Sequence, residues 1–133
     1  MGAEFLTSLC IEKVGTTRWR LLSPLHYRSV VFPGLFVVPR GFETDLASIP
    51  VAIQSFIPKV GNYDAAAVLH DAGYANRLLT ASQREVYTAK PVIDKLFHEA
   101  CLSLGVGRAR AWAMYQAVKL WGDPLGHPSR RTV

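Results

Sequence analysis

Long hydrophobic runs are missing from this 133-residue sequence. A helix that spans a bilayer needs about 20 consecutive apolar residues, and no run in the chain approaches that length. The first residues, MGAEFLTSLCIEKVG, carry the acidic Glu4 and lack a basic region followed by a long apolar stretch. The sequence therefore predicts neither a transmembrane segment nor a signal peptide.

Cysteine is also scarce. Cys10 and Cys101 are far apart and are not in a spacing typical of a metal site, so we expect free thiols and no need for an oxidising compartment. The chain has no GxSxG, no phosphate-binding P-loop, no GxGxxG and no HExxH motif. The enzyme classes that these motifs mark are therefore not indicated.

Acidic residues are outnumbered, because 10 Asp and Glu against 15 Lys and Arg give a formal net charge of +5. The bases are spread out, with some clustering at Arg108, Arg110 and the last residues, HPSRRTV. Such an excess favours contact with anionic lipid, nucleic acid or an acidic partner surface, but solubility and a solvated tail explain it more simply. No motif with interleaved basic and aromatic residues indicates specific nucleic-acid binding.

The length and the pattern of the chain predict one domain over residues 1–122, followed by a flexible tail at 123–133. Residues 1–40 are rich in β-forming segments, TRWRLLS, HYRSVVF and PGLFVVP, which prolines and glycine separate. We expect antiparallel β hairpins there. Residues 41–122 begin with a compact loop, RGFETDLASIP, and continue as helices. The predicted fold class is therefore α+β.

Three long helical segments are expected after the loop: NYDAAAVLHDAGYANRLL, PVIDKLFHEACLSLGVG and RARAWAMYQAVKLWG. A shorter helix, VAIQSFIP, is expected before them. Asn62 and Asp64 are candidate N-caps of the first long helix, and Gly105 and Gly107 are candidate C-caps of the second. A short connection between the first two long helices would make them an antiparallel pair.

Titratable residues in this half of the chain form a candidate catalytic group. Asp94 on one helix can lie opposite His70 on the other, where a carboxylate that binds one imidazole nitrogen leaves the second nitrogen as a base. Asp71 diverges from His70 by about 100° on a helix, so it can face the loop that contains Asp45. Two carboxylates and loop carbonyls would suit Ca²⁺, which can activate water against an ester or amide.

Other interpretations of the same residues remain open. His70 and Asp94 can belong to a structural hydrogen-bond network, and spacing alone favours that interpretation over catalysis. Asp45 can be a turn residue, and Asp94 a first-turn carboxylate stabilised by the helix dipole. His98 lies one turn beyond Asp94 and would allow a zinc site with His70, although zinc is the weaker option.

Two resemblances bear on these alternatives. The segments LSPLHYRS, VVPRGFETDLASIP, GNYDAAAVLHDAGY, IDKLF and MYQAVKLWG resemble an uncharacterised family of small proteins encoded by tailed phages and prophages. The resemblance covers most of residues 21–122, with Leu46 where that family more often has glycine. It implies synthesis in a host cytoplasm and association with the virion, but no settled activity.

The segments TDLAS, VLHDAGYAN and IDKLF also resemble secreted phospholipase A2, particularly the small prokaryotic form, in order and in spacing. The resemblance implies that His70 is the general base and that Asp94 orients it. It also implies a calcium site made by the side chains of Asp45 and Asp71 and the carbonyl of Leu46, with Tyr74 near the dyad. The cysteines of that group are absent, so the expected core is phospholipase A2-like without its disulfides.

Three functional hypotheses follow. The leading one is a phage-encoded hydrolase that acts on a lipid or another ester, with His70 and Asp94 as a calcium-assisted dyad. The second is a non-enzymatic virion protein of the tail or neck, or an accessory protein, in which the same residues are structural and the partners are other virion proteins. The third is a zinc hydrolase that uses His70, His98 and Asp94. The first hypothesis also implies contact with a lipid or membrane surface.

Overall fold

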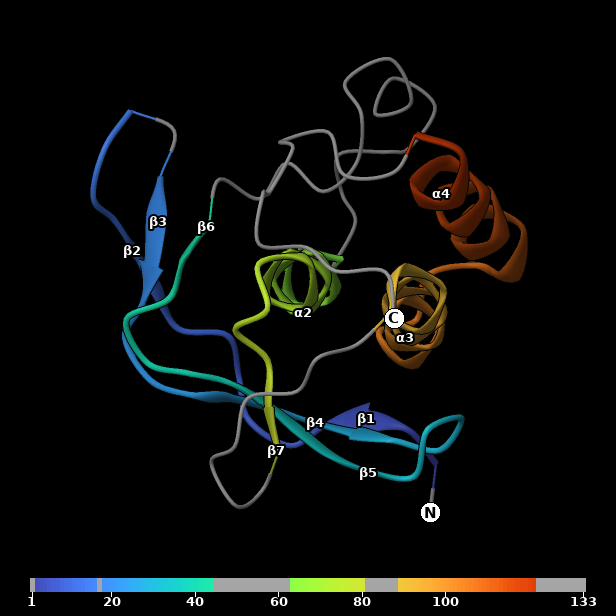
Figure 1. Cartoon of the computed structure of the whole chain (residues 1–133), viewed down its shortest axis with the longest axis horizontal. Helices are drawn as coiled ribbons and strands as arrows, with labels where there is room; N and C mark the ends of the chain where they lie inside the picture. The colour runs from blue at the N-terminus through green and yellow to red at the C-terminus, as the bar shows by residue number, and fades with distance from the viewer. Residues whose placement is uncertain (1, 17, 45–62, 81–88, 122–133) are drawn as a thin grey trace.

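Residues 2–16, 18–44, 63–80 and 89–121 are described by a computed structural model of the chain (Figure 1). Within these residues, antiparallel strands form two sheets and precede most of the helical structure. The α+β class and the order of strands before helices, both predicted from the sequence, are therefore confirmed.

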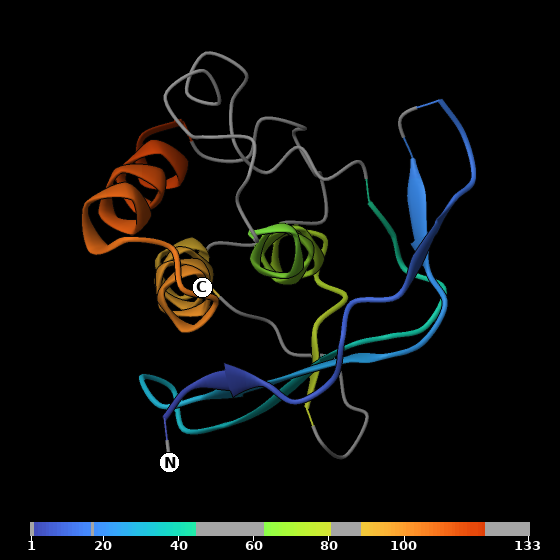
Figure 2. The same ribbon diagram turned by 180° about the vertical axis from the view of Figure 1, so that it is seen from behind.

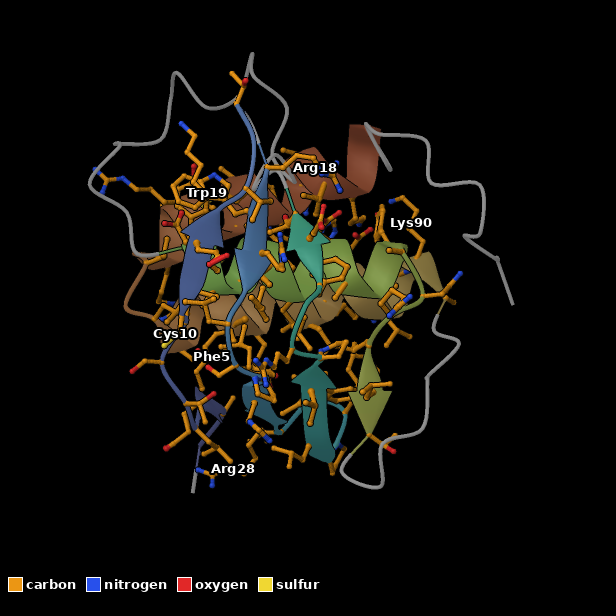
Figure 3. The ribbon with its side chains drawn as sticks, turned by 90° about the vertical axis from the view of Figure 1, so that its left-hand side faces the viewer. Phe5, Cys10, Arg18, Trp19, Arg28 and Lys90 are labelled. Atoms are coloured by element: carbon orange, nitrogen blue, oxygen red, sulfur yellow. The ribbon has the colours of Figure 1, made fainter. Side chains whose placement is uncertain are left out.

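The strands pair in antiparallel fashion throughout. One sheet has the order β1 (Glu4–Phe5), β4 (Leu25–Ser29), β5 (Gly34–Val38) and β7 (Leu79–Thr80). The other has the order β2 (Ile11–Lys13), β3 (Trp19–Leu21) and β6 (Glu43–Thr44). Figure 3 looks onto the strands and shows Trp19 in the second sheet and Arg28 at the far end of the first.

The β4–β5 hairpin is the longest pairing and aligns Leu25 with Val38 and Ser29 with Gly34. Burial alternates along β4, where Leu25, Tyr27 and Ser29 are buried, because successive side chains of a strand point to opposite faces. Gly34 follows the turn with φ 149°, a backbone conformation that favours glycine. The buried face of this hairpin supports the helices.

Three helices are described: α2 (Asp64–Tyr74), α3 (Lys90–Ser103) and α4 (Arg108–Trp121). Helix α2 lies in the middle of the molecule, with α3 on one side, strands β2, β3 and β6 on the other and the four-stranded sheet below (Figures 1 and 2). Every residue from Ala66 to Tyr74 is buried as a result. His70 and Asp71 therefore lie inside the fold rather than on its surface.

Helices α2 and α3 run in opposite directions, as predicted. Two contacts show this: Gly73 lies against Ile93, and the ring of His70, earlier on α2, lies near that of Phe97, later on α3. Close approach depends on Gly73, since a Cβ atom there would lie 2.8 Å from Ile93 Cγ2. Pro91 stands in the first turn of α3, where its missing N–H costs no helical hydrogen bond. Gly105 follows the end of α3 with φ 88°, as expected of a C-cap glycine.

Some local expectations differ from the structure. The N-cap of α2 is Tyr63, and Asp64 is instead an acidic residue of the first turn, favourably placed for the helix dipole. The predicted helix extended to Leu79, but α2 ends at Tyr74 and Leu79 instead forms β7 with Thr80 beside β5. The chain turns away after α2 at Asn76, whose φ is 58°. The expected short helix at 51–58, Asn62 and the tail at 123–133 lie outside the described residues. None of the described helices has the length and apolar character that a bilayer crossing requires.

Candidate active site

His70 of α2 and Asp94 of α3 meet in the interior, as the sequence predicted. His70 Nε2 lies 2.8 Å from Asp94 Oδ1, and the two residues are 2% and 0% exposed. The ring of His70 packs against those of Tyr74 and Phe97, with centroid distances of 4.2 and 5.1 Å. These two ring contacts restrict the imidazole, so the hydrogen bond to Asp94 has a defined direction.

Asp94 also accepts hydrogen bonds from two further side chains. The hydroxyl of Tyr74, one helical turn beyond His70, donates to Oδ1 over 2.8 Å, and Lys90 Nζ donates to Oδ2 over 2.8 Å. Tyr74 thus lies near the dyad, where the resemblance to phospholipase A2 places it. Both carboxylate oxygens are used, which is how a buried charge is tolerated inside a protein.

Lys90 joins a third helix to this group. Its ammonium donates to the carbonyls of Val118 and Lys119, at 3.2 and 3.0 Å, in the last turns of α4. These carbonyls carry the partial negative charge of a helix C-terminus, so a cation there is favourable. Lys90 therefore ties α4 to the carboxylate that holds His70. Sequence reasoning did not assign this role to Lys90, although its spacing of four residues from Asp94 is a recognised signal for an ion pair on one helix face.

The charge state of Asp94 follows from these contacts. Burial alone would raise its pKa, but the hydrogen bonds from His70, Lys90 and Tyr74 outweigh burial and hold the pKa of Asp94 below its ordinary value. The carboxylate is thus ionised at neutral pH and can accept a hydrogen bond only from a protonated Nε2 of His70. That tautomer leaves Nδ1 as an acceptor. Within the part of the chain that the structure describes, Nδ1 has no hydrogen-bond partner.

The predicted calcium ligands are only partly described. Asp71 is buried, 7% exposed, and engaged in an interaction of its own. Asp45 and Leu46 lie outside the described residues, so the loop on which the predicted site depends stays a prediction. Among the described residues, no three His, Cys, Asp or Glu side chains are grouped so as to hold a metal ion.

His98 does not join the dyad. Its ring stacks on that of Tyr115 at a centroid distance of 4.9 Å, and burial lowers its pKa. His70, Asp94 and His98 are all described, and they do not form a metal-binding group. The predicted zinc site from these three residues is therefore not assembled. The reason is that His98 belongs to the side of α3 that faces Tyr115, whereas Asp94 faces α2.

A second carboxylate of α3, Glu99, was missed by the sequence analysis. Glu99 Oε1 accepts hydrogen bonds from the hydroxyls of Tyr27 and Ser29, at 2.7 and 2.8 Å. Oε2 accepts them from the backbone N–H groups of Val30 and Val31, at 3.0 and 2.8 Å. Glu99 therefore fixes the turn between β4 and β5, and no local pattern links it to residues about 70 positions earlier.

The family model described as "Protein of unknown function (DUF1353)" matches residues 19–118, and the chain belongs to that family. No curated protein and no solved structure matches the chain. The matched range includes the dyad residues His70 and Asp94, together with Tyr74, Lys90 and Glu99.

Proposed function

We propose that the protein is a phage-encoded hydrolase of a lipid or another ester, with His70 as the general base and Asp94 as the residue that orients it. One observation carries the proposal: a buried imidazole is held through Nε2 by an ionised carboxylate, and its Nδ1 has no partner among the described residues. Such an arrangement prepares a base that can take a proton from water.

Each residue has a defined part in this chemistry. Nδ1 of His70 accepts a proton from a water molecule as the oxygen attacks the ester carbonyl. The imidazolium that forms is stabilised by Asp94, which stays ionised because Lys90 and Tyr74 also donate to it. The proton then leaves from Nδ1 to the alcohol product. The rings of Tyr74 and Phe97 pack against the imidazole and hold it in place. The ring therefore needs little reorientation before it can accept the proton.

A calcium ion would complete the site. The side chains of Asp71 and Asp45 and the carbonyl of Leu46 would hold it, and this all-oxygen donor set fits a hard cation. When bound, Ca²⁺ would polarise the ester carbonyl and stabilise the oxyanion. The burial of Asp71, directly beside His70 in α2, is compatible with such a role.

A second candidate function is a non-enzymatic component of the phage virion, in the tail or neck, or an accessory protein. The observation that favours it is that Asp94 is fully buried and that three side chains bind its carboxylate. A network of that kind can serve stability alone, with His70 as a structural partner. Its partners would then be other virion proteins.

The test is hydrolysis of mixed phospholipid micelles and of a short-chain nitrophenyl ester, with Ca²⁺ and with a chelator. We expect calcium-dependent release of fatty acid or nitrophenol, with a loss of about 10³-fold or more in His70→Ala and Asp71→Asn. Glu99→Gln is the matched control, since it changes a carboxylate on α3 away from the dyad. Folding of every variant is checked by circular dichroism. Equal activity of folded wild type and His70→Ala, or none in either, would exclude the enzyme and favour the virion component.

A further inference from the structure

Large apolar side chains are exposed where the β4–β5 turn lies beside α3 and α4. Val31 in the turn is 55% exposed, Leu102 on α3 40% and Trp112 on α4 58%. Val30 is exposed next to Val31. Figure 1 shows this turn on the same side of the molecule as α3 and α4, and the reverse view in Figure 2 agrees. Isolated apolar side chains are common on surfaces, but a group of this size at one place indicates an interaction site.

A shallow hollow joins these elements. It has a volume of about 360 Å³ and is mainly apolar. The residues that line it come from the turn, from α3 and from α4: Val31, Lys95, His98, Glu99, Leu102 and Tyr115. Val31 and Leu102 therefore border the same hollow, and Trp112 lies on α4 three residues before Tyr115, which also lines it.

The turn that presents the two valines is held in place. Glu99 binds the backbone N–H groups of Val30 and Val31, and the hydroxyl of Ser29 that it binds accepts the N–H of Phe32. The valine side chains thus project from a fixed backbone, so little ordering entropy is lost when they are covered. The carboxylate oxygens of Glu99 point to these donors and not to the exposed side of the hollow.

Exposed basic residues surround this surface. Arg108, Trp112, Tyr115 and Lys119 follow one another at spacings of three or four residues and form a single stripe on α4. Helix α4 contains no acidic residue, and Lys95 of α3 borders the hollow. Within the described part of the chain, Lys95, Arg108 and Lys119 are exposed and form no ion pair. Their charge is therefore available to an anionic partner.

We propose that this surface docks the protein on a bilayer that contains anionic lipids. We call it the apolar–basic surface and define it as Val30, Val31, Lys95, Leu102, Arg108, Trp112 and Lys119. Exposed tryptophan and branched aliphatic side chains suit the boundary between headgroups and acyl chains, while flexible Lys and Arg side chains reach the phosphate layer. The negative headgroups of such a bilayer would contact the basic side chains, and its fluid interior could fill the shallow apolar hollow. Docking does not require hydrolysis by His70, so it goes beyond the proposed function.

The experiment measures co-sedimentation of the full chain with phosphatidylcholine vesicles, with and without about one-third phosphatidylglycerol. We expect binding to the anionic vesicles only, weakened by added salt because surface charges are screened. Val31→Asp and Trp112→Ala should each lower the partition coefficient about tenfold, and the double variant Lys95→Glu/Arg108→Glu by at least that much. His70→Ala should bind as wild type, which separates docking from catalysis.

Two control variants sharpen the result. Leu22→Asp changes an exposed leucine, and Lys13→Glu an exposed lysine, both on the part of the chain near β2 and β3. We expect near wild-type binding from both, because neither residue belongs to the apolar–basic surface. Equal losses in controls and surface variants would show a general attraction of a cationic protein and would overturn the proposal. Absence of binding at low salt would overturn it as well, as would a stable dimer in sedimentation that Val31→Asp disrupts.

Discussion

Two carboxylates on α3 differ in the donors that surround them. Asp94 is bound by an imidazole, a phenol and an ammonium, all from side chains. Glu99, five positions later on α3, is bound by two hydroxyls and two backbone N–H groups. Backbone donors can only fix a turn, whereas an imidazole can also accept and release a proton near neutral pH. The comparison identifies Asp94 as part of a candidate chemical site and Glu99 as an anchor for the β4–β5 turn.

The largest effect is expected from Asp94→Ala. The change leaves His70, Tyr74 and Lys90 without their shared acceptor in the interior, which should lower the free energy of unfolding by about 3–5 kcal/mol. Urea denaturation measures the loss. Asp94→Asn keeps the shape and should cost less, so equal losses in the two variants would contradict the assignment of the effect to unpaired donors.

Glu99→Gln should have a smaller effect, about 1–3 kcal/mol, because the amide keeps one acceptor oxygen and the site is closer to solvent. The loss should be local, with faster hydrogen exchange at the amides of Val30 and Val31 and little change at α2. Ser29→Ala, which removes one of the four donors to Glu99, is the milder control. Unchanged exchange at Val30 and Val31 in Glu99→Gln would disprove the anchoring role.

Lys90→Met should destabilise by about 1–2 kcal/mol, since it removes a partly exposed cation from Asp94 and from the end of α4. Its clearer signature is electrostatic. Without the ammonium, the pKa of Asp94 should move upward, so the acid limb of any pH–rate profile should shift to higher pH. Lys95→Met is the matched control on the same helix and should leave that profile unchanged.

The smallest effect concerns acid stability. Hydrogen bonds hold the pKa values of both Asp94 and Glu99 below their ordinary values despite burial. A carboxyl whose pKa is lowered by folding adds stability above its unfolded pKa, and that stability is lost as the pH falls through the folded pKa. Unfolding free energy should therefore decline below about pH 4, by about 1 kcal/mol less in Glu99→Gln than in wild type. An identical acid dependence would show that Glu99 does not contribute.

The sequence predicted that His70 and Asp94 pair, but not which other residues bind Asp94. His70 and Asp94 were predicted to face each other because helical periodicity, a local signal, assigns them to two successive helices. The antiparallel packing of α2 and α3 confirms this, although β7 lies between the helices where a short connection was expected. The role of Lys90 depends on the carbonyls of Val118 and Lys119, which only the packing of α4 brings near. Such contacts between distant parts of the chain leave no periodic pattern.

The same reasoning explains the other differences. Glu99 binds a turn that lies 68 to 72 positions earlier, so its role was not predictable from local sequence. The zinc group, which was the weaker alternative, is not assembled because three candidate ligands on two neighbouring helices need not share a face. The α+β class was predictable, since proline-separated β segments followed by alanine-rich periodic segments differ clearly in composition.

The most direct test of the central claim is the protonation of the two nitrogens of His70, measured by ¹⁵N nuclear magnetic resonance of labelled protein at neutral pH. We predict a neutral ring with the proton on Nε2, directed at Asp94, and an unprotonated Nδ1. Asp94→Asn should change this preference, while Glu99→Gln should preserve it. A proton on Nδ1 of the neutral ring, or a ring protonated on both nitrogens at neutral pH, would contradict the claim that Asp94 prepares His70 as a base.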